Sequence, residues 1–153
     1  MASFRVRHAG LLAALRDARA REIPAVYAND NRGVWDGNAA RLVWQAIHEG
    51  LGGELITSVA PREGDRFVVK PRYSAFDHTP LELILRDLEI ERILLAGTAT
   101  EGCVVQTAID GRELGFKISV LADACASSDE RLEQIALVYL EEVVGARLVR
   151  AGA

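Results

Sequence analysis

The stretch Gly97-Thr98-Ala99-Thr100-Glu101-Gly102-Cys103 joins the apolar run 92–96 to an amphipathic segment over 104–115. This order predicts a buried strand, a turn and a helix, which is the repeating unit of α/β folds. With Thr100 as the N-cap, Cys103 takes the third helical position, within the positive end of the helix dipole. Thiols at helix N-termini become nucleophilic, and free amides in the same turn can hold an oxyanion. An ordinary buried cysteine, packed between helix and sheet, is an equally open interpretation.

The remainder of the chain repeats this alternation of strands and helices. The first helix is expected to end near residues 21–22, and the capping box Thr79-Pro80-Leu81-Glu82 is expected to open another. Further helices are predicted over 104–114 and 129–143, and strands over 23–29, 66–70, 92–98, 117–122 and 146–149. Such alternation predicts an open three-layer α/β/α sandwich with a mostly parallel sheet of about five strands, in a single domain over 1–153.

Composition narrows the class of protein. The chain has 153 residues, half of them hydrophobic, and its net charge of -4 is spread without a basic stripe. These properties favour one soluble domain and argue against nucleic acid as a partner. The sequence has no apolar segment near the length of a membrane span and no secretion-type leader, so we expect a cytoplasmic protein away from membranes. Gly97 and Gly102 are too sparse for a dinucleotide loop, so no nucleotide cofactor is expected.

Ligands of open α/β folds bind beyond the carboxyl ends of the strands. Lys70 ends the predicted strand 66–70, and an ammonium there favours the thiolate form of Cys103. A lysine that extends to the surface is the competing interpretation. His78, which follows in the next loop, is a weaker candidate for a Cys/His pair. Cys125 has nothing local to activate it, and we interpret it as structural.

Loop residues beyond the strands supply candidate walls for a pocket. Trp35, Tyr73 and Phe76 either hold a planar or apolar substrate or cover the end of the sheet. Asp30 and Asp36 are interpreted as residues of turns and caps rather than as catalytic carboxylates.

Together these segments resemble the isochorismatase-like cysteine hydrolases, which include nicotinamidases and N-carbamoylsarcosine amidohydrolases. The resemblance is carried by four segments. They are Val26-Tyr27-Ala28-Asn29-Asp30-Asn31, Val69-Lys70-Pro71 with Ser74-Ala75-Phe76, residues 97–104 with Thr107-Ala108, and Asp123-Ala124.

The resemblance implies hydrolysis of a small amide or related carbon–nitrogen bond through a thioester-type intermediate, with a small-molecule substrate and no cofactor. It implies Cys103 as the nucleophile, Lys70 as its activating cation, and the amides of Ala99 and Cys103 as the oxyanion hole. It also implies a cis peptide bond between Thr98 and Ala99 and a homo-oligomer. We expect the candidate substrate pocket to be formed by Asn29, Trp35, Tyr73, Phe76 and Thr107.

One part of the family pattern has no counterpart here. The family's catalytic aspartate ends a strand that precedes the first helix, and no residue of this sequence matches it. We therefore expect a domain shortened at its N-terminus relative to the family, with impaired hydrolysis. The alternatives are a non-catalytic protein for small-molecule binding or assembly and, more weakly, a redox-sensing thiol protein. Asp30-Asn31-Arg32 lacks the Asp-x-His-x-His run of the metal-binding relatives, so neither a metal nor nicotinamidase activity is expected.

Overall fold

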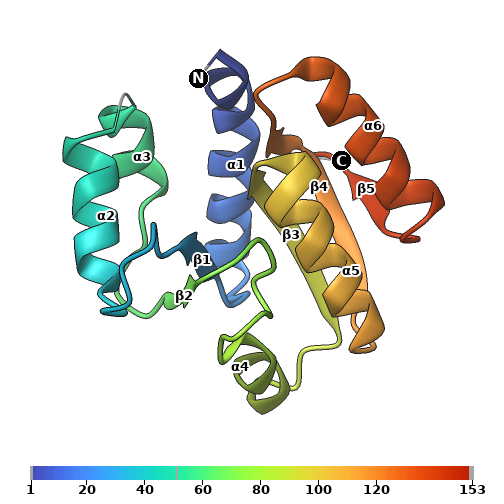
Figure 1. The fold of residues 1–153 in the computed structure, drawn as a ribbon, viewed down its shortest axis with the longest axis horizontal. Coiled ribbons are helices and arrows are strands. Elements are labelled where there is room, and N and C mark those ends of the chain that lie inside the picture. Colours follow the sequence, from blue (N-terminus) through green and yellow to red (C-terminus); the bar gives the residue numbers. More distant parts are fainter. Residues whose placement is uncertain (1, 51, 152–153) are drawn as a thin grey trace.

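The computed structural model describes residues 2–50 and 52–151, which alternate between helices and strands (Figure 1). In chain order the elements are α1 (Ala2–Ala20), β1 (Val26–Asp30), α2 (Ala39–His48), α3 (Gly53–Val59), β2 (Arg66–Lys70), α4 (Leu81–Asp87), β3 (Arg92–Thr98), η1 (Thr100–Val104), α5 (Val105–Glu113), β4 (Lys117–Ala126), α6 (Glu130–Glu142) and β5 (Arg147–Val149).

All strand pairs in the described part of the chain are parallel, and they form two sheets. β1 pairs with β2, from Val26 opposite Arg66 to Asp30 opposite Lys70. The second sheet has the order β3-β4-β5. The predicted α/β architecture with five parallel strands is confirmed. The division into two sheets was not predicted, because the apolar pattern of a strand does not identify its neighbour.

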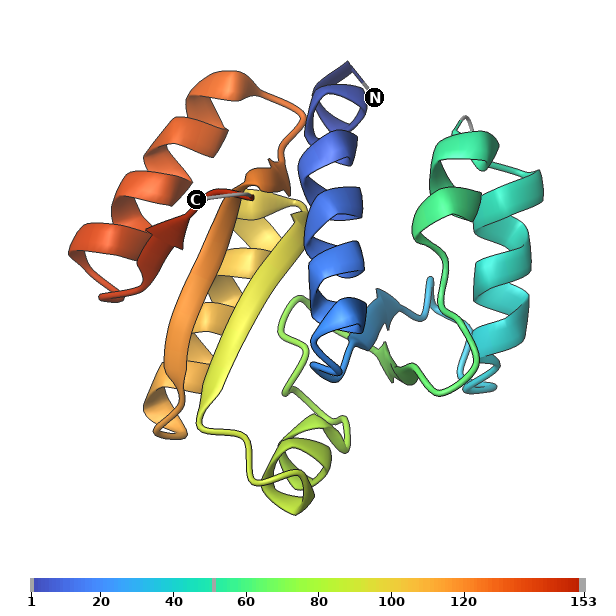
Figure 2. The same ribbon diagram turned by 180° about the vertical axis from the view of Figure 1, so that it is seen from behind.

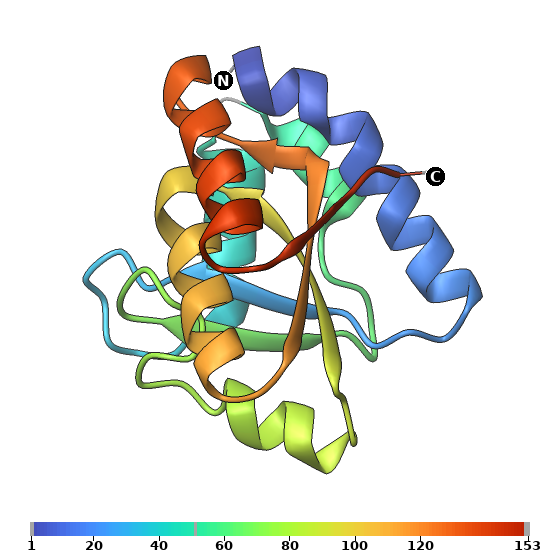
Figure 3. The same ribbon diagram turned by 90° about the vertical axis from the view of Figure 1, so that its right-hand side faces the viewer.

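Helices cover both faces of the three-stranded sheet. Figure 3 shows α5 and α6 on one side of this sheet and α1 on the other. The crossing of α1 over β4 is close, because a Cβ at Gly10 would lie 2.6 Å from the carbonyl oxygen of Asp123. Glycine is therefore required at this position for backbone approach. The α2–α3 pair lies on the far side of α1 from α6 (Figure 2).

The main core lies between β3, β4 and the helices that follow them. It is built from Ala75, Leu81, Leu85, Val104, Ala108, Phe116, Ile118, Val120, Ala122, Cys125, Leu137, Leu140, Val144 and Ala146. Ile93 and Leu95 of β3 pack against this cluster. Leu94 points to the opposite face and is 53% exposed. One face of β3 is therefore packed against the core, partly buried, and the other is open.

Three elements differ from the sequence-based expectation. β4 continues to Ala126, four residues beyond the predicted end, so it includes Asp123 and Cys125. Pro80 is the N-cap of α4 rather than its first helical residue. The Oγ1 of Thr79 accepts a hydrogen bond from the amide of Leu81 at 3.1 Å. Thr79 therefore caps the helix from the residue before the N-cap, whereas a capping box places the threonine at the N-cap itself. The helix α3 was not predicted, because its seven residues are too few for helical periodicity to be recognised.

A buried carboxylate ties α6 to two other elements and leads to a prediction about stability. Glu133 is 1% exposed, accepts a hydrogen bond from the amide of Ser127 at 3.0 Å and forms an ion pair with Arg7 of α1 at 2.5 Å. We expect Glu133→Gln to lower the free energy of unfolding by about 1–3 kcal/mol, since it weakens a charged hydrogen bond inside the protein. Urea denaturation measures the change. Glu141→Gln, on the exposed side of the same helix, is the control, and equal effects of the two substitutions would contradict the assignment.

Candidate active site

The candidate site is built on a lysine–cysteine contact between β2 and η1. Lys70, the last residue of β2, is 4% exposed, and its Nζ donates a hydrogen bond to the Sγ of Cys103 at 3.2 Å. The same Nζ donates to the carbonyl oxygen of Arg72 at 2.8 Å. In the part of the chain that the structure describes, Lys70 has no carboxylate within ion-pair distance. Its ammonium is thus buried against a thiol instead of a carboxylate.

Cys103 lies in a π-helical turn, η1, that precedes α5. The peptide bond between Thr98 and Ala99 is cis. The carbonyl oxygen of Ala99 accepts hydrogen bonds from the amides of Gly102 at 3.1 Å and Val104 at 3.2 Å. The prediction that Thr100 is the N-cap is wrong, because the turn begins at Ala99 and has no side-chain cap. Thr100 is instead fully buried, and its Oγ1 has no hydrogen-bond partner among the described residues.

The loop after Lys70 is fixed against α5. Thr107 is buried, and its Oγ1 accepts a hydrogen bond from the amide of Ala75 at 2.9 Å. Phe76 is half-buried and stacks on Phe116 with 5.8 Å between ring centroids. Thr107 therefore positions the loop, and Phe76 belongs to the packing around the core.

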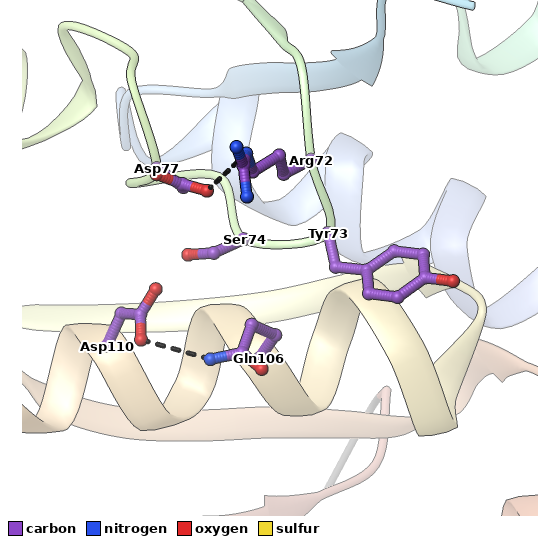
Figure 4. Close-up of a pocket in the computed structure, with 6 residues that line it drawn as sticks. All are labelled: Arg72, Tyr73, Ser74, Asp77, Gln106 and Asp110. Atoms are coloured by element: carbon purple, nitrogen blue, oxygen red, sulfur yellow. Dashed lines mark hydrogen bonds and ion pairs between the residues drawn. The ribbon is translucent and has the colours of Figure 1, made fainter.

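A small pocket of about 190 Å³ lies between this loop and α5 (Figure 4). Its lining residues are Arg72, Tyr73, Ser74, Asp77, Gln106 and Asp110. Arg72 pairs with Asp77 at 3.4 Å, and the amide nitrogen of Gln106 donates to Asp110 at 3.2 Å. The pocket is mostly polar in its side chains and adjoins the catalytic candidates, since the carbonyl of Arg72 binds Lys70.

Of the five residues proposed for the pocket, only Tyr73 lines it. Thr107 and Phe76 have the packing roles described above, and the other two lie elsewhere. Asn29 is exposed near the end of β1, and Trp35 is 79% exposed in the following loop. That loop is held by its own side chains: the amide of Arg32 donates to Asp30 at 2.7 Å, and the amide of Asn38 donates to Asp36 at 3.0 Å. Local turns therefore direct Trp35 into solvent. The two aspartates have the turn and cap roles expected from the sequence.

The remaining candidates do not contact Cys103. His78 is exposed, and its Nε2 lies 3.2 Å from Asp77. Asp123 lies within β4, where its carboxylate accepts hydrogen bonds from the amide of Ala151 at 3.0 and 3.1 Å. The described residues contain no group of three or more His, Cys, Asp or Glu side chains placed to hold a metal ion. None of the helices in the described residues is long and apolar enough to cross a membrane.

Five of the residues that line the pocket were not predicted from the sequence: Arg72, Ser74, Asp77, Gln106 and Asp110. A signal for two of them was present, because Gln106 and Asp110 are four residues apart and therefore lie on one face of the helix that follows Cys103. The position of Arg72 and Asp77 depends on the path of the loop, which local sequence does not determine.

The second cysteine differs sharply from the first and gives a pH-dependent prediction. Cys125 is fully buried, and burial raises the pKa of its thiol to about 11. Unfolding exposes this thiol and returns its pKa to roughly 8.5, so the unfolded state loses the proton first as the pH rises. The stabilisation from Cys125 is therefore complete below about pH 8.5 and is lost towards pH 11. The free energy of unfolding, measured by urea denaturation, should fall between pH 7.5 and pH 10 in the wild type. The fall should be smaller in Cys125→Ala. Parallel pH dependence in the two proteins would contradict this prediction.

Comparison of this chain with known proteins identifies its family. The family model described as Isochorismatase domain matches residues 9–151. The uncharacterized isochorismatase family protein YaaI of Bacillus subtilis is 31% identical over 138 residues, which cover 90% of this chain and 76% of that protein.

Two named hydrolases are also similar. Ureidoacrylate amidohydrolase RutB of Klebsiella pneumoniae is 39% identical over 93 residues, which cover 60% of this chain and only 39% of that protein. The crystal structure of N-carbamoylsarcosine amidase from Thermoplasma acidophilum matches with a TM-score of 0.78 and 28% identity, over 100% of this chain and 87% of that one. The family model spans nearly the whole chain, and Lys70 contacts Cys103 in the turn after β3. The chain therefore belongs to the isochorismatase domain family.

Proposed function

We propose that this chain is a cysteine hydrolase that cleaves a small amide or a related carbon–nitrogen bond. The observation that carries the proposal is the 3.2 Å contact between the Nζ of buried Lys70 and the Sγ of Cys103. The contact places a cationic donor directly on the sulfur, where it can assist attack by Cys103. Two similar proteins, an amidohydrolase and an amidase, support the reaction class.

In the first half of the proposed reaction, the thiolate of Cys103 attacks the carbonyl carbon of the substrate. The amides of Ala99 and Cys103 donate hydrogen bonds to the oxyanion that forms. When this intermediate collapses, the carbon–nitrogen bond breaks and the leaving nitrogen takes a proton from Lys70. The products of this step are a thioester on Cys103, a free amine or ammonia, and a neutral Lys70.

In the second half, water attacks the thioester carbon and gives its proton to the neutral amine of Lys70. The carbon–sulfur bond then breaks, which releases the carboxylic acid and restores the thiolate–ammonium pair. Lys70 carries both protons in this proposal because it is the titratable side chain within hydrogen-bond distance of Sγ among the described residues. Proton transfer by a positioned side chain contributes about 10²–10⁴-fold to rates of this kind.

The pocket favours a small substrate. The pocket has a volume of about 190 Å³ and is lined by one cationic side chain, two carboxylates and the side-chain amide of Gln106. Such a pocket suits a compact polar substrate better than an extended chain. The direct test is release of ammonia from a panel of ureido and carbamoyl compounds and simple amides, with nicotinamide as the member expected to react least. The proposal predicts turnover of at least one member, together with a Cys103 thioester that acid quenching and mass spectrometry detect. Absence of both turnover and a Cys103 adduct across the panel would contradict it.

A second candidate function is binding of the same class of ligand without turnover. It is favoured by the absence, in the described residues, of any carboxylate within ion-pair distance of Lys70. The family's aspartate would occupy that role. Calorimetry with the same panel separates the two: binding that survives Cys103→Ser and is never followed by hydrolysis supports this second function.

A further inference from the structure

Lys70 and Cys103 are placed for a covalent reaction with each other. The Nζ of Lys70 lies 3.2 Å from the Sγ of Cys103, and the lysine is 4% exposed. Its second hydrogen bond, to the carbonyl oxygen of Arg72 at 2.8 Å, holds the nitrogen beside the sulfur. Atoms about 3–3.5 Å apart are already at the separation from which reacting groups form a bond. A bond between this nitrogen and this sulfur therefore needs only a small movement of the two side chains.

The two cysteines of the chain differ in their access to an oxidant. Cys103 is partly exposed, whereas Cys125 is fully buried in β4. Oxidation of a cysteine follows its exposure and its thiolate character, so a small peroxide reaches Cys103 first. Among the described residues, a lysine nitrogen rather than a second sulfur lies within hydrogen-bond distance of this thiol. The group that can react with an oxidised Cys103 is therefore the amine of Lys70.

The chemistry of such a pair has two steps. Hydrogen peroxide transfers a hydroxyl group to the thiolate of Cys103, which gives a sulfenic acid, and the hydroxide that leaves takes a proton from the Lys70 ammonium. The lysine is now a neutral amine, and its nitrogen attacks the sulfur. The sulfur–nitrogen bond forms, the sulfur–oxygen bond breaks, and the hydroxyl leaves as water with a proton from the amine. In total one peroxide is reduced to two waters, and the sulfur is oxidised by two electrons.

We propose that hydrogen peroxide converts the Lys70–Cys103 pair into a covalent sulfenamide crosslink, in which Nζ is bonded to Sγ. β2 belongs to the two-stranded sheet, and η1 follows β3 of the three-stranded sheet, so the bond joins the two sheets. A thiol such as dithiothreitol reverses the bond: it attacks the sulfur, releases the amine, and a second thiol group frees Cys103. The crosslink thus keeps the sulfur from the irreversible sulfinic acid.

Mass spectrometry of the wild-type chain after brief treatment with hydrogen peroxide tests the bond without any substrate. The crosslinked chain should be about 2 Da lighter than the reduced chain, because the net change is the loss of two hydrogen atoms. Trypsin cleaves after Arg66, Arg72, Arg92 and Arg112, so non-reducing digestion should release peptide 67–72 joined to a peptide that contains Cys103. Dithiothreitol should separate the two peptides and restore the original mass.

Lys70→Met is the matched variant, compared at equal loss of the Cys103 thiol. It should give no linked peptides and should accumulate sulfinic acid, about 32 Da heavier, which dithiothreitol does not reduce. Lys117→Met, which removes an exposed lysine of β4, should form the crosslink as the wild type does. A wild type that forms sulfinic acid to the same extent as Lys70→Met would overturn the proposal. So would linkage of Cys103 to the peptide of Cys125, or a loss of about 2 Da confined to the Cys103 peptide.

Discussion

Replacing Cys103 with serine should lower kcat/KM for the amide substrate by about 10³-fold or more, because loss of a catalytic nucleophile removes the covalent route. The substitution changes one atom at a half-buried position in η1, so the fold should be retained. Steady-state release of ammonia measures the rate, and circular dichroism checks the fold.

Cys125→Ser is the matched control for this prediction. It makes the same chemical change at the buried cysteine of β4, outside the site. Activity of this control should remain within about threefold of the wild type, provided that the protein stays folded. A Cys103→Ser variant that retains more than about a tenth of the wild-type rate would show that the thiol is not the nucleophile.

Replacing Lys70 with methionine should lower kcat by about 10²-fold or more, because the variant lacks both the charge beside Sγ and the proton carrier. KM should change little, since Lys70 is not among the residues that line the pocket. Methionine has a similar length and no charge, so it fills the space that the aliphatic part of the Lys70 side chain occupies. We therefore expect a folded and inactive protein, measured by kinetics and urea denaturation together.

Lys117→Met is the control for the lysine. Lys117 begins β4 with an exposed side chain whose Nζ is 3.9 Å from Glu91, so its loss should leave both kcat and stability nearly unchanged. A Lys70→Met protein with kcat within about threefold of the wild type would exclude the lysine from both proposed roles.

The α/β class and the positions of Lys70 and Cys103 at strand ends could be predicted because they depend on local patterns. Apolar runs with turn signals mark strands, and parallel strands align their carboxyl ends at one edge of a fold. The contact between the two side chains joins two separate sheets, so strand patterns alone did not require it. The resemblance to a family located the same pair, and the family itself is shown by the match over residues 9–151.

Other features depend on contacts between distant segments and were not accessible. Thr100 was expected to cap a helix, but it is buried, and the turn starts from the carbonyl of Ala99. Trp35 was expected in the pocket, but turns within its own loop leave it in solvent. The division of the strands into two sheets likewise depends on which edges pair, which strand patterns do not specify.

The central claim is that Lys70 makes Cys103 reactive, and the most direct measurement is the rate of alkylation of Cys103 by iodoacetamide at pH 7. Peptide mass spectrometry separates this site from Cys125, whose buried thiol keeps its proton at that pH because its pKa is raised to about 11. The account predicts that Cys103 reacts about tenfold or more faster in the wild type than in Lys70→Met, while Cys125 stays unmodified in both folded proteins. Equal rates at Cys103 in the two proteins would contradict it.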